Sequence, residues 1–410
     1  MALLYGESQM VDHTRRGFLG AALASSTAAA FITPVQALAK DKGVVRITNI
    51  DIFNISIPTP QEMLDRGVIN GYTVAAVDTD AGVRGYSFAG PPPELLARTI
   101  RPTLVGKDLF AIDDHLKAGL IDWGGLEHAL WDAIGKIAGE PVYRLLGSSK
   151  SAITVYLTCV WRGKEDQSEV PYHAQAEMAA RIQKAGFKGM KIRAWRPNPL
   201  DDVAACAEVR KAVGPDFYLM FDRTAHFPGK VWDYDTALEV ARGLEKHHAY
   251  WLEEPFDRND FLSPARLARD VDILITGGEG YRGLDAYREV VTQNSLDILQ
   301  PDARNVGGIL TVRKVAALAE AFHKRVILHG TMGLSLAGWL QASAAIGAEW
   351  QELALITPPL LPEEEWSPAL KVLNSKTVFD FRDGQIQLPE RPGLGLDINE
   401  EALRRYRLNS

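Results

Sequence analysis

Three short apolar segments in the middle of the chain decide the fold: FYLMFD at residues 217–222, YWLEE at 250–254 and ILITGGE at 273–279. Segments with helical spacing of apolar residues, at 235–246 and 265–269, separate them. Apolar strands that alternate with helices form a parallel sheet that is covered on both faces. This stretch therefore predicts an α/β fold.

The same alternation extends from residue 151 to about residue 361. Eight strands are expected, at residues 153–158, 189–193, 217–222, 250–254, 273–279, 296–302, 325–329 and 350–355. Further helices are expected at 174–184, 201–213, 284–292 and 310–322. Eight parallel strands separated by helices close into a TIM barrel. A doubly wound open sheet is the alternative, but it usually carries a Gly-rich turn after its first strand, and the segment from Cys159 to Arg162 offers none.

The flanking regions have a different pattern. Residues 44–57 and 72–78 are β-branched runs, and residues 94–146 have helical periodicity, which together predict an α+β domain at residues 44–150. The tail, residues 362–410, contains strand-like pieces at 377–381 and 385–388. We expect this tail to return to the first domain and complete it.

The first 39 residues are expected to be an export signal. Arg15 and Arg16 precede an Ala-rich apolar run, and Ala37-Leu38-Ala39 supplies the small-x-small pattern that a signal peptidase cuts. This order resembles a bacterial twin-arginine signal and predicts a periplasmic protein with no membrane association after export. An N-terminal amphipathic helix is the alternative.

The composition excludes several classes of protein. Of the 410 residues, 46% are apolar and 24% are charged, as in ordinary globular proteins. The 45 basic and 52 acidic side chains give a net charge of −7, which argues against a nucleic-acid-binding surface. Cys159 and Cys206 are expected on a strand and a helix, and we expect no disulfide between them.

Acidic residues occupy three consecutive strand ends. Asp222, Glu253 and Glu279 end the third, fourth and fifth expected strands, where the carboxyl ends of barrel strands form the active site. Carboxylates placed so close would repel one another, and a hard divalent cation, Mg²⁺, would relieve the conflict. Ordinary surface acids with Lys or Arg partners are the alternative. Because side chains alternate along a strand, Glu254 is expected to point away from this ion. We expect it to form a salt bridge beside Glu253.

The remaining strand ends supply cations and a base. Lys191 and Arg193 point inward from the second strand. Asp302 and His329 end the sixth and seventh strands, so the carboxylate would accept the Nδ1 proton and leave Nε2 facing the site. This arrangement predicts a general base, although a lone histidine after an apolar strand is often structural.

The last strand contributes Glu352, with Glu349 as the second choice. A protonated Glu352 would donate a hydrogen bond to developing oxyanion charge, as neutral carboxylic acids do in apolar sites. A salt bridge at the rim of the barrel is the alternative.

In this order, the motifs resemble the enolase superfamily, specifically its mandelate racemase/muconate lactonizing enzyme-like branch. The matching pieces are Lys191-x-Arg193, Asp222, Trp251-Leu-Glu-Glu-Pro255, Gly278-Glu279, Pro301-Asp302 and His329. The resemblance covers residues 44–400 and implies a modified TIM barrel of the (β/α)7β type with a capping domain. It also implies Mg²⁺ bound by Asp222, Glu253 and Glu279, a base formed by Asp302 and His329, and Lys191 near the substrate carboxylate.

The resemblance implies abstraction of the proton next to a carboxylate. Racemases of this branch carry Lys-x-Lys, whereas Arg193 is effectively always protonated and makes a poor second base. A single-base reaction therefore fits better: dehydration of a sugar acid, an aldonate or aldarate, to a 2-keto-3-deoxy acid. A one-base epimerase or racemase, a lactone cycloisomerase, and an exported sugar-acid binding protein without turnover are the alternatives.

Further residues have lower rank. His226 lies in the loop after Asp222 and is either an acid that protonates the departing hydroxyl or a solvent-exposed histidine. Other pocket candidates are Trp161, Arg162, Arg223, Arg304 and Asn305. Substrate selectivity is expected from the loop at residues 58–72, and the resemblance implies a homo-oligomer that acts on a small-molecule carboxylate.

Overall fold

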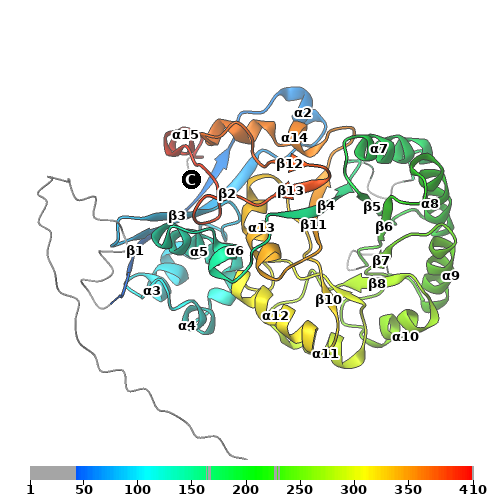
Figure 1. The fold of residues 1–410 in the computed structure, drawn as a ribbon, viewed down its shortest axis with the longest axis horizontal. Coiled ribbons are helices and arrows are strands. Elements are labelled where there is room, and N and C mark those ends of the chain that lie inside the picture. Colours follow the sequence, from blue (N-terminus) through cyan, green and yellow to red (C-terminus); the bar gives the residue numbers. More distant parts are fainter. Residues whose placement is uncertain (1–42, 163, 165–167, 226–228, 230, 409–410) are drawn as a thin grey trace, which may run out of the picture.

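The structure, a computed structural model, describes residues 43–162, 164, 168–225, 229 and 231–408. It contains a large α/β unit and a smaller α+β unit beside it (Figure 1). The predicted export signal, residues 1–39, and the candidate acid His226 lie outside the described residues. Among the described residues, no helix combines the length and the apolar character that a membrane span requires.

In the described ranges of the chain, eight short parallel strands form the barrel. They are β4 (Ala152–Cys159), β5 (Gly189–Arg193), β6 (Tyr218–Asp222), β7 (Trp251–Glu253), β8 (Leu274–Gly277), β9 (Ile298–Leu299), β10 (Arg325–Val326) and β11 (Trp350–Ile356). Strands β4 to β10 pair in chain order, and β11 pairs with β4. An isolated bridge between Thr331 and Leu353 joins the segment after β10 to β11. The sheet thus returns on itself, and the open-sheet alternative is wrong.

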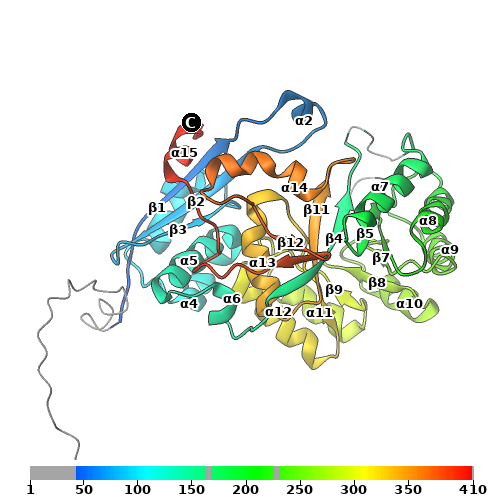
Figure 2. The ribbon, with the colours of Figure 1, turned by 45° about the horizontal axis from the view of Figure 1, so that its top comes forward.

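Within the part of the chain that the structure describes, seven helices alternate with these strands. They cover the outside of the barrel (Figures 1 and 2). They are α7 (Tyr172–Lys184), α8 (Leu200–Val213), α9 (Tyr234–Glu245), α10 (Leu262–Asp270), α11 (Asp285–Gln293), α12 (Ile309–Ala321) and α13 (Leu336–Ala345). Helix α9 shows why they form: the Asp233 side chain caps it by accepting from Thr236 N at 2.8 Å. Its buried residues recur at intervals of three or four and so lie on one face of the helix: Ala237, Val240, Ala241 and Leu244. The (β/α)7β fold class is confirmed.

Alternation along each strand separates the helix-facing side chains from those inside the barrel. On β6, Leu219 and Phe221 pack beneath the helices, whereas Met220 belongs to the interior cluster. That cluster is large and apolar, and consists of Tyr156, Met220, Trp251, Ile298, Ile327 and Trp350. Asp222 continues the inward face of β6 beyond Met220. The polar side chains that face inward therefore collect above this apolar plug, at the carboxyl ends of the strands.

The smaller unit is an antiparallel sheet covered by helices. Its strands are β1 (Ile47–Ser56), β2 (Gly71–Thr79) and β3 (Arg84–Ser87). Its helical segments are α2 (Gln61–Asp65), η1 (Leu96–Ile100), α3 (Arg101–Leu104), α4 (Ile112–Lys117), η2 (Leu120–Trp123), α5 (Gly124–Ala138) and α6 (Val142–Leu145). Helix α2 and its loop lie on the same side of the molecule as α14 (Pro362–Glu365), and Lys371 Nζ donates to Pro58 O at 2.7 Å (Figure 2).

The tail contacts both units. After α14 and η4 (Ser367–Val372), a hairpin of β12 (Phe381–Arg382) and β13 (Gln385–Gln387) pairs with β4 of the barrel. The strand expected at 377–381 is thus almost absent, because only Phe381 enters the hairpin. Helix α15 (Glu400–Arg405) packs in a core shared with β1 and β2, and Leu408 N donates to Asn54 O at 2.9 Å. Both cysteines are free and buried, as expected.

Candidate active site

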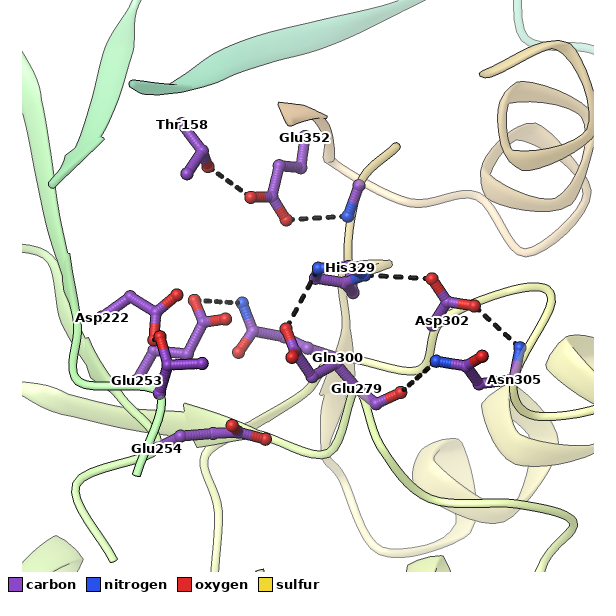
Figure 3. Close-up of polar contacts among 12 residues, drawn as sticks. Thr158, Asp222, Glu253, Glu254, Glu279, Gln300, Asp302, Asn305, His329 and Glu352 are labelled. Atoms are coloured by element: carbon purple, nitrogen blue, oxygen red, sulfur yellow. Dashed lines mark hydrogen bonds and ion pairs between the residues drawn. The ribbon is translucent and has the colours of Figure 1, made fainter. Parts of the chain in front are cut away.

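The strand ends bring together the polar residues that the sequence singles out (Figure 3). Arg193, Asp222 and Glu253 are direct neighbours across β5, β6 and β7 in the sheet register. They lie on the inward side of the barrel because Ile192, Phe221 and Leu252 occupy the alternate, helix-facing positions. Glu279 lies two residues beyond β8, after Gly277 and Gly278, which have positive φ angles.

Lys191 is buried among carboxylates. Its Nζ lies 2.7 Å from Glu253 Oε2, 3.0 Å from Glu352 Oε1 and 3.8 Å from Asp222 Oδ2. Burial alone would lower the pKa of Lys191, but the three carboxylates outweigh this effect and raise the pKa well above its usual range. Lys191 is therefore held as a cation at neutral pH.

Arg193 is the second buried cation. Its Nη1 donates to Asp222 Oδ2 and, at 2.7 Å, to Thr224 Oγ1, which in turn donates to Asp222 Oδ1 at 2.7 Å. Burial would lower the pKa of Arg193, but Asp222 and the neighbouring glutamates raise it. Arg193 thus binds the Asp222 carboxylate and stays protonated.

Arg258 connects Glu254 to Glu279. The guanidinium binds the Glu254 carboxylate through Nε at 2.9 Å and Nη2 at 2.8 Å, and the same Nη2 donates to Glu279 Oε1. Glu254 therefore turns away from Glu253 and is salt-bridged, as expected. Its φ of 46° lies in the left-handed region, which marks the sharp turn after β7.

Asp302 and His329 contact each other as expected. His329 Nδ1 lies 3.0 Å from Asp302 Oδ2, and Nε2 lies 3.0 Å from Glu279 Oε2 (Figure 3). Burial would lower the pKa of His329, but Glu279 and Asp302 raise it to about 10. Burial would likewise raise the pKa of Asp302, but the hydrogen bond from His329 outweighs it and lowers that pKa. The contact with Asp302 orients the ring so that Nε2 faces the carboxylates.

Glu352, and not Glu349, faces the site. The Glu352 side chain is 1% exposed, whereas Glu349 is 62% exposed and pairs with Arg325 at the other end of the strand. Glu352 accepts from Thr158 Oγ1, from Gly330 N at 2.7 Å and from Lys191. Burial would raise its pKa, but Lys191 and His329 lower it to about 2. The expected protonated form of Glu352 is therefore wrong, because this carboxylate is ionised and surrounded by donors.

Asp222, Glu253 and Glu279 fit a hard divalent cation by donor type, and they lie at or just beyond the ends of three neighbouring strands. Among the described residues, no three acidic, histidine or cysteine side chains are already arranged to hold a metal ion. Each of these three carboxylates instead contacts a cationic side chain: Glu253 contacts Lys191, Asp222 contacts Arg193 and Glu279 contacts Arg258. These cations do not fully neutralise the cluster. Burial raises the pKa of Glu253 and Lys191 lowers it, but Asp222 and Glu352 raise it further. The pKa of Glu253 therefore lies above the usual range of a glutamate. An added dication would keep the cluster ionised, and the assignment of these ligands stays a prediction.

Several residues of this site were not predicted from the sequence. Gln300 Nε2 donates to Glu253 Oε2 at 3.1 Å, and its Oε1 has no hydrogen-bond partner in the described structure. Thr158, Thr224 and Arg258 also contact the carboxylates. Their signal was positional: Thr158 is the residue before the last in β4, Gln300 directly follows β9, and Arg258 lies four residues after Glu254.

The lower-ranked candidates divide into two groups. Asn305 lies near the site, because its Nδ2 donates to Glu279 O at 3.3 Å, whereas the Arg304 side chain is exposed. Arg223 donates to Ala194 O and lies over the Trp232 ring, so these contacts give it a role in packing. Trp161 and Arg162 lie in the loop after β4, and Trp161 packs against the barrel core at its edge.

Known proteins are similar to this chain in sequence and in fold. The arabinonate dehydratase of Saccharolobus solfataricus is 29% identical over 287 residues, 70% of this chain and 72% of that protein. The D-galactarolactone cycloisomerase of Agrobacterium fabrum is 30% identical, over 69% of this chain and 73% of its own length. The solved D-glucarate dehydratase of Agrobacterium tumefaciens, complexed with magnesium, is 27% identical, and the match covers 89% of this chain and 99% of that one with a TM-score of 0.74. The enolase C-terminal domain-like family model matches residues 173–402, more than half of the chain. This protein therefore belongs to the enolase C-terminal domain-like family.

Proposed function

We propose that this protein is a Mg²⁺-dependent lyase that removes the proton next to the carboxylate of a sugar acid and expels the β-hydroxyl as water. One observation carries the proposal: His329 Nε2 faces the carboxylate cluster and Asp302 orients it, while Lys191 and Arg193 are both held protonated. The contact of His329 Nε2 with Glu279 raises the pKa of His329 to about 10 in the metal-free protein, and a dication on Glu279 would replace that contact and leave His329 free to act as a base. With Lys191 and Arg193 fixed as cations, the site then has one base, which supports dehydration better than two-base racemisation. Names of relatives, such as arabinonate dehydratase and L-talarate/galactarate dehydratase, agree with this class of substrate.

Each residue has a distinct part in the proposed reaction. Asp222, Glu253 and Glu279 would hold the ion, which supplies positive charge to the oxygens of the substrate carboxylate as the α-proton leaves. His329 Nε2 takes that proton, and Asp302 stabilises the resulting imidazolium through Nδ1.

The remaining steps conserve atoms and charge. The electron pair of the broken C–H bond forms the new C=C bond as the C–O bond breaks, and the β-hydroxyl leaves as water with the proton that His329 Nε2 has taken, which returns His329 to its neutral form. The enol that remains tautomerises to a 2-keto-3-deoxy acid. Lys191 and Arg193, fixed at the same mouth, would bind and orient the carboxylate of the substrate.

The loop at residues 58–72 is placed to influence selectivity. A Cβ atom on Gly67 would lie 2.2 Å from Arg162 Cδ, so the capping loop already contacts the loop after β4. Arg162 Nε donates to Thr357 Oγ1 at 3.2 Å and Nη2 donates to Leu355 O at 3.3 Å, which links this contact to the end of β11. We infer that the capping loop closes the mouth of the barrel above Glu352.

The experiment is a screen of aldonates and aldarates for 2-keto-3-deoxy products, with purified protein in Mg²⁺ and in EDTA. We expect turnover of at least one sugar acid in Mg²⁺, loss of turnover in EDTA and recovery on adding Mg²⁺. Calorimetric titration of the metal-free protein should show Mg²⁺ uptake. A protein that binds Mg²⁺ and turns over no member of the panel would contradict the proposal.

A lactone cycloisomerase is the second candidate, because two relatives carry that activity in their names. Incubation with substrate in deuterated buffer distinguishes the two reactions. Incorporation of deuterium without loss of water favours cycloisomerisation or epimerisation. Tight binding of a sugar acid that is unchanged in His329→Ala, without any reaction, would instead indicate a binding protein.

We also propose that the protein is exported to the periplasm and forms a homo-oligomer. The paired Arg15 and Arg16, the apolar run and the Ala37-Leu38-Ala39 pattern support export. Cell fractionation of the full-length protein and of an Arg15→Lys, Arg16→Lys double variant tests it, since the variant should stay in the cytoplasm. Light scattering during size-exclusion chromatography measures the oligomeric state.

A further inference from the structure

We propose that Glu127, on helix α5 of the capping unit, is a positioning residue for the Asp302–His329 pair. The Glu127 side chain is fully buried and crosses from the capping unit to the barrel. Its Oε2 accepts from Ile309 N at 2.9 Å, and its Oε1 accepts from Leu310 N at 3.0 Å and from Trp131 Nε1 at 2.7 Å. The proposal rests on the proposed function of Asp302 and His329 and adds a residue outside the barrel to it.

Glu127 supplies a cap that helix α12 lacks. The residue before α12 is Gly308, which has no side chain to accept from the first backbone N–H groups of the helix. A carboxylate at this end also complements the helix dipole. Glu127 therefore fixes the start of α12 from another part of the chain, 182 residues away from Ile309.

The turn between Asp302 and Gly308 transmits this constraint to the base. At its beginning, Asp302 Oδ1 accepts from Arg304 N at 2.9 Å and Asn305 N at 2.7 Å, and Val306 N donates to Asp302 O at 3.0 Å. At its end, Gly308 N donates to Ala303 O at 2.9 Å. A shift of Gly308 would therefore move the backbone that carries Asp302, whose Oδ2 contacts His329.

A close backbone contact fixes the same turn. A Cβ atom on Gly124, the first residue of α5, would lie 2.3 Å from Arg304 O and 2.6 Å from Gly308 N. A Cβ atom on Gly308 would lie 2.5 Å from the Glu127 carboxyl group. The turn thus packs directly on α5, and the capping unit helps to set the position of the base.

Helix α5 also offers a matched control. Asp132 is a second buried carboxylate that joins distant backbone groups, accepting from Tyr86 N at 2.7 Å and Leu394 N at 2.8 Å. Asp132→Asn and Glu127→Gln each place an amide where two backbone N–H groups need an acceptor, so both should lower the thermal midpoint. Only Glu127 contacts the segment that leads to Asp302.

The experiment compares Glu127→Gln, Asp132→Asn and the parent enzyme on an accepted sugar acid. For Glu127→Gln we expect kcat to fall about tenfold with KM within about twofold, because a small misplacement of a base slows chemistry more than binding. For Asp132→Asn we expect kcat within about twofold of the parent. Equal losses of kcat in the two variants would overturn the proposal.

A second readout does not require turnover. In protein labelled with ¹⁵N-histidine, the Nδ1 proton of His329, assigned with His329→Asn, should give a protected resonance in the parent. Glu127→Gln should shift this resonance or speed its exchange with solvent, and Asp132→Asn should not. An unchanged resonance in Glu127→Gln overturns the proposal, whereas an inactive parent with a shifted resonance contradicts only the proposed function.

If Glu127→Gln does not fold, Gly124→Ala replaces it. Gly124 has a helical φ of −53°, so alanine is compatible with its backbone, and the added methyl group pushes on the turn at Arg304 O. The same shift of the His329 resonance is expected, and a folded Gly124→Ala with the resonance of the parent would overturn the proposal.

Discussion

Substitution of Lys191 by methionine removes the positive charge at the centre of the carboxylate cluster. Methionine keeps the length of the lysine stem and leaves the apolar packing largely intact. The Lys191 side chain is 1% exposed, so water cannot replace the lost ammonium group. In the parent, Lys191 Nζ lies 2.7 Å from Glu253 Oε2 and 3.0 Å from Glu352 Oε1. In the variant these two carboxylates face each other without their shared counter-ion.

The expected loss of stability is large in the absence of metal. Removing one partner of a buried ion pair costs about 3–5 kcal/mol, and Lys191 serves two close carboxylates, so the upper half of this range is expected in EDTA. Mg²⁺ would restore positive charge beside Glu253, and a ligand at 100 times its Kd stabilises a protein by about 2.7 kcal/mol. The variant should therefore gain more stability from Mg²⁺ than the parent does, because lysine no longer competes with the ion.

The assay is urea unfolding of the parent and Lys191→Met, in EDTA and in saturating Mg²⁺. Lys117→Met is the control, since Lys117 is 71% exposed and pairs with Asp113 on the surface. A free-energy loss in EDTA that is no larger than that of the control would refute the reasoning. If Mg²⁺ raises the unfolding free energy of the parent and of Lys191→Met by the same amount, the inference that Lys191 competes with the ion would be refuted.

Three more predictions concern the base and the carboxylates. His329→Asn should abolish turnover but retain Mg²⁺ binding measured by calorimetry, and the exposed control His323→Asn should keep activity. Activity of His329→Asn within about tenfold of the parent would contradict the assignment of His329 as the base. The pKa of His329 is raised from 6.5 to about 10, so its stabilising contribution in EDTA is complete below about pH 6.5 and is lost as the pH rises towards 10. The difference in unfolding free energy between the parent and His329→Asn should therefore shrink over that range. A difference that stays constant would contradict this prediction. Glu254→Gln should weaken Mg²⁺ binding about tenfold, because Arg258 would then bind Glu279 more closely, and an unchanged Kd in calorimetry would argue against this link.

The proposed reaction and the inferred role of Glu127 place different demands on the molecule. The reaction needs the carboxylates and the base at one end of the barrel, which strand alternation supplies. The rate of the proton transfer would in addition depend on how firmly the turn after Asp302 is held. That support comes from α5, which belongs to a different unit from the strands that carry the site.

The sequence predicted the fold class and most of the polar strand ends, because strand alternation and helix spacing are local properties of the chain. Asp222, Glu253 and Glu279 could be found for this reason: the first two end apolar strands, and Glu279 lies two residues beyond the end of one. The sequence failed where regular pairing depends on a distant partner, as in the tail at 377–381, of which only Phe381 joins the hairpin on β4.

The tertiary structure decided which groups meet and in which charge state. Glu352 is ionised because folding brings it to Lys191 and to Thr158, which is 194 residues away, and no local pattern specifies such a contact. The cap of α12 by Glu127 likewise depends on the packing of two units. Periodicity thus decides the face of a strand on which a side chain lies, whereas its partner, burial and pKa are set only when distant segments pack together.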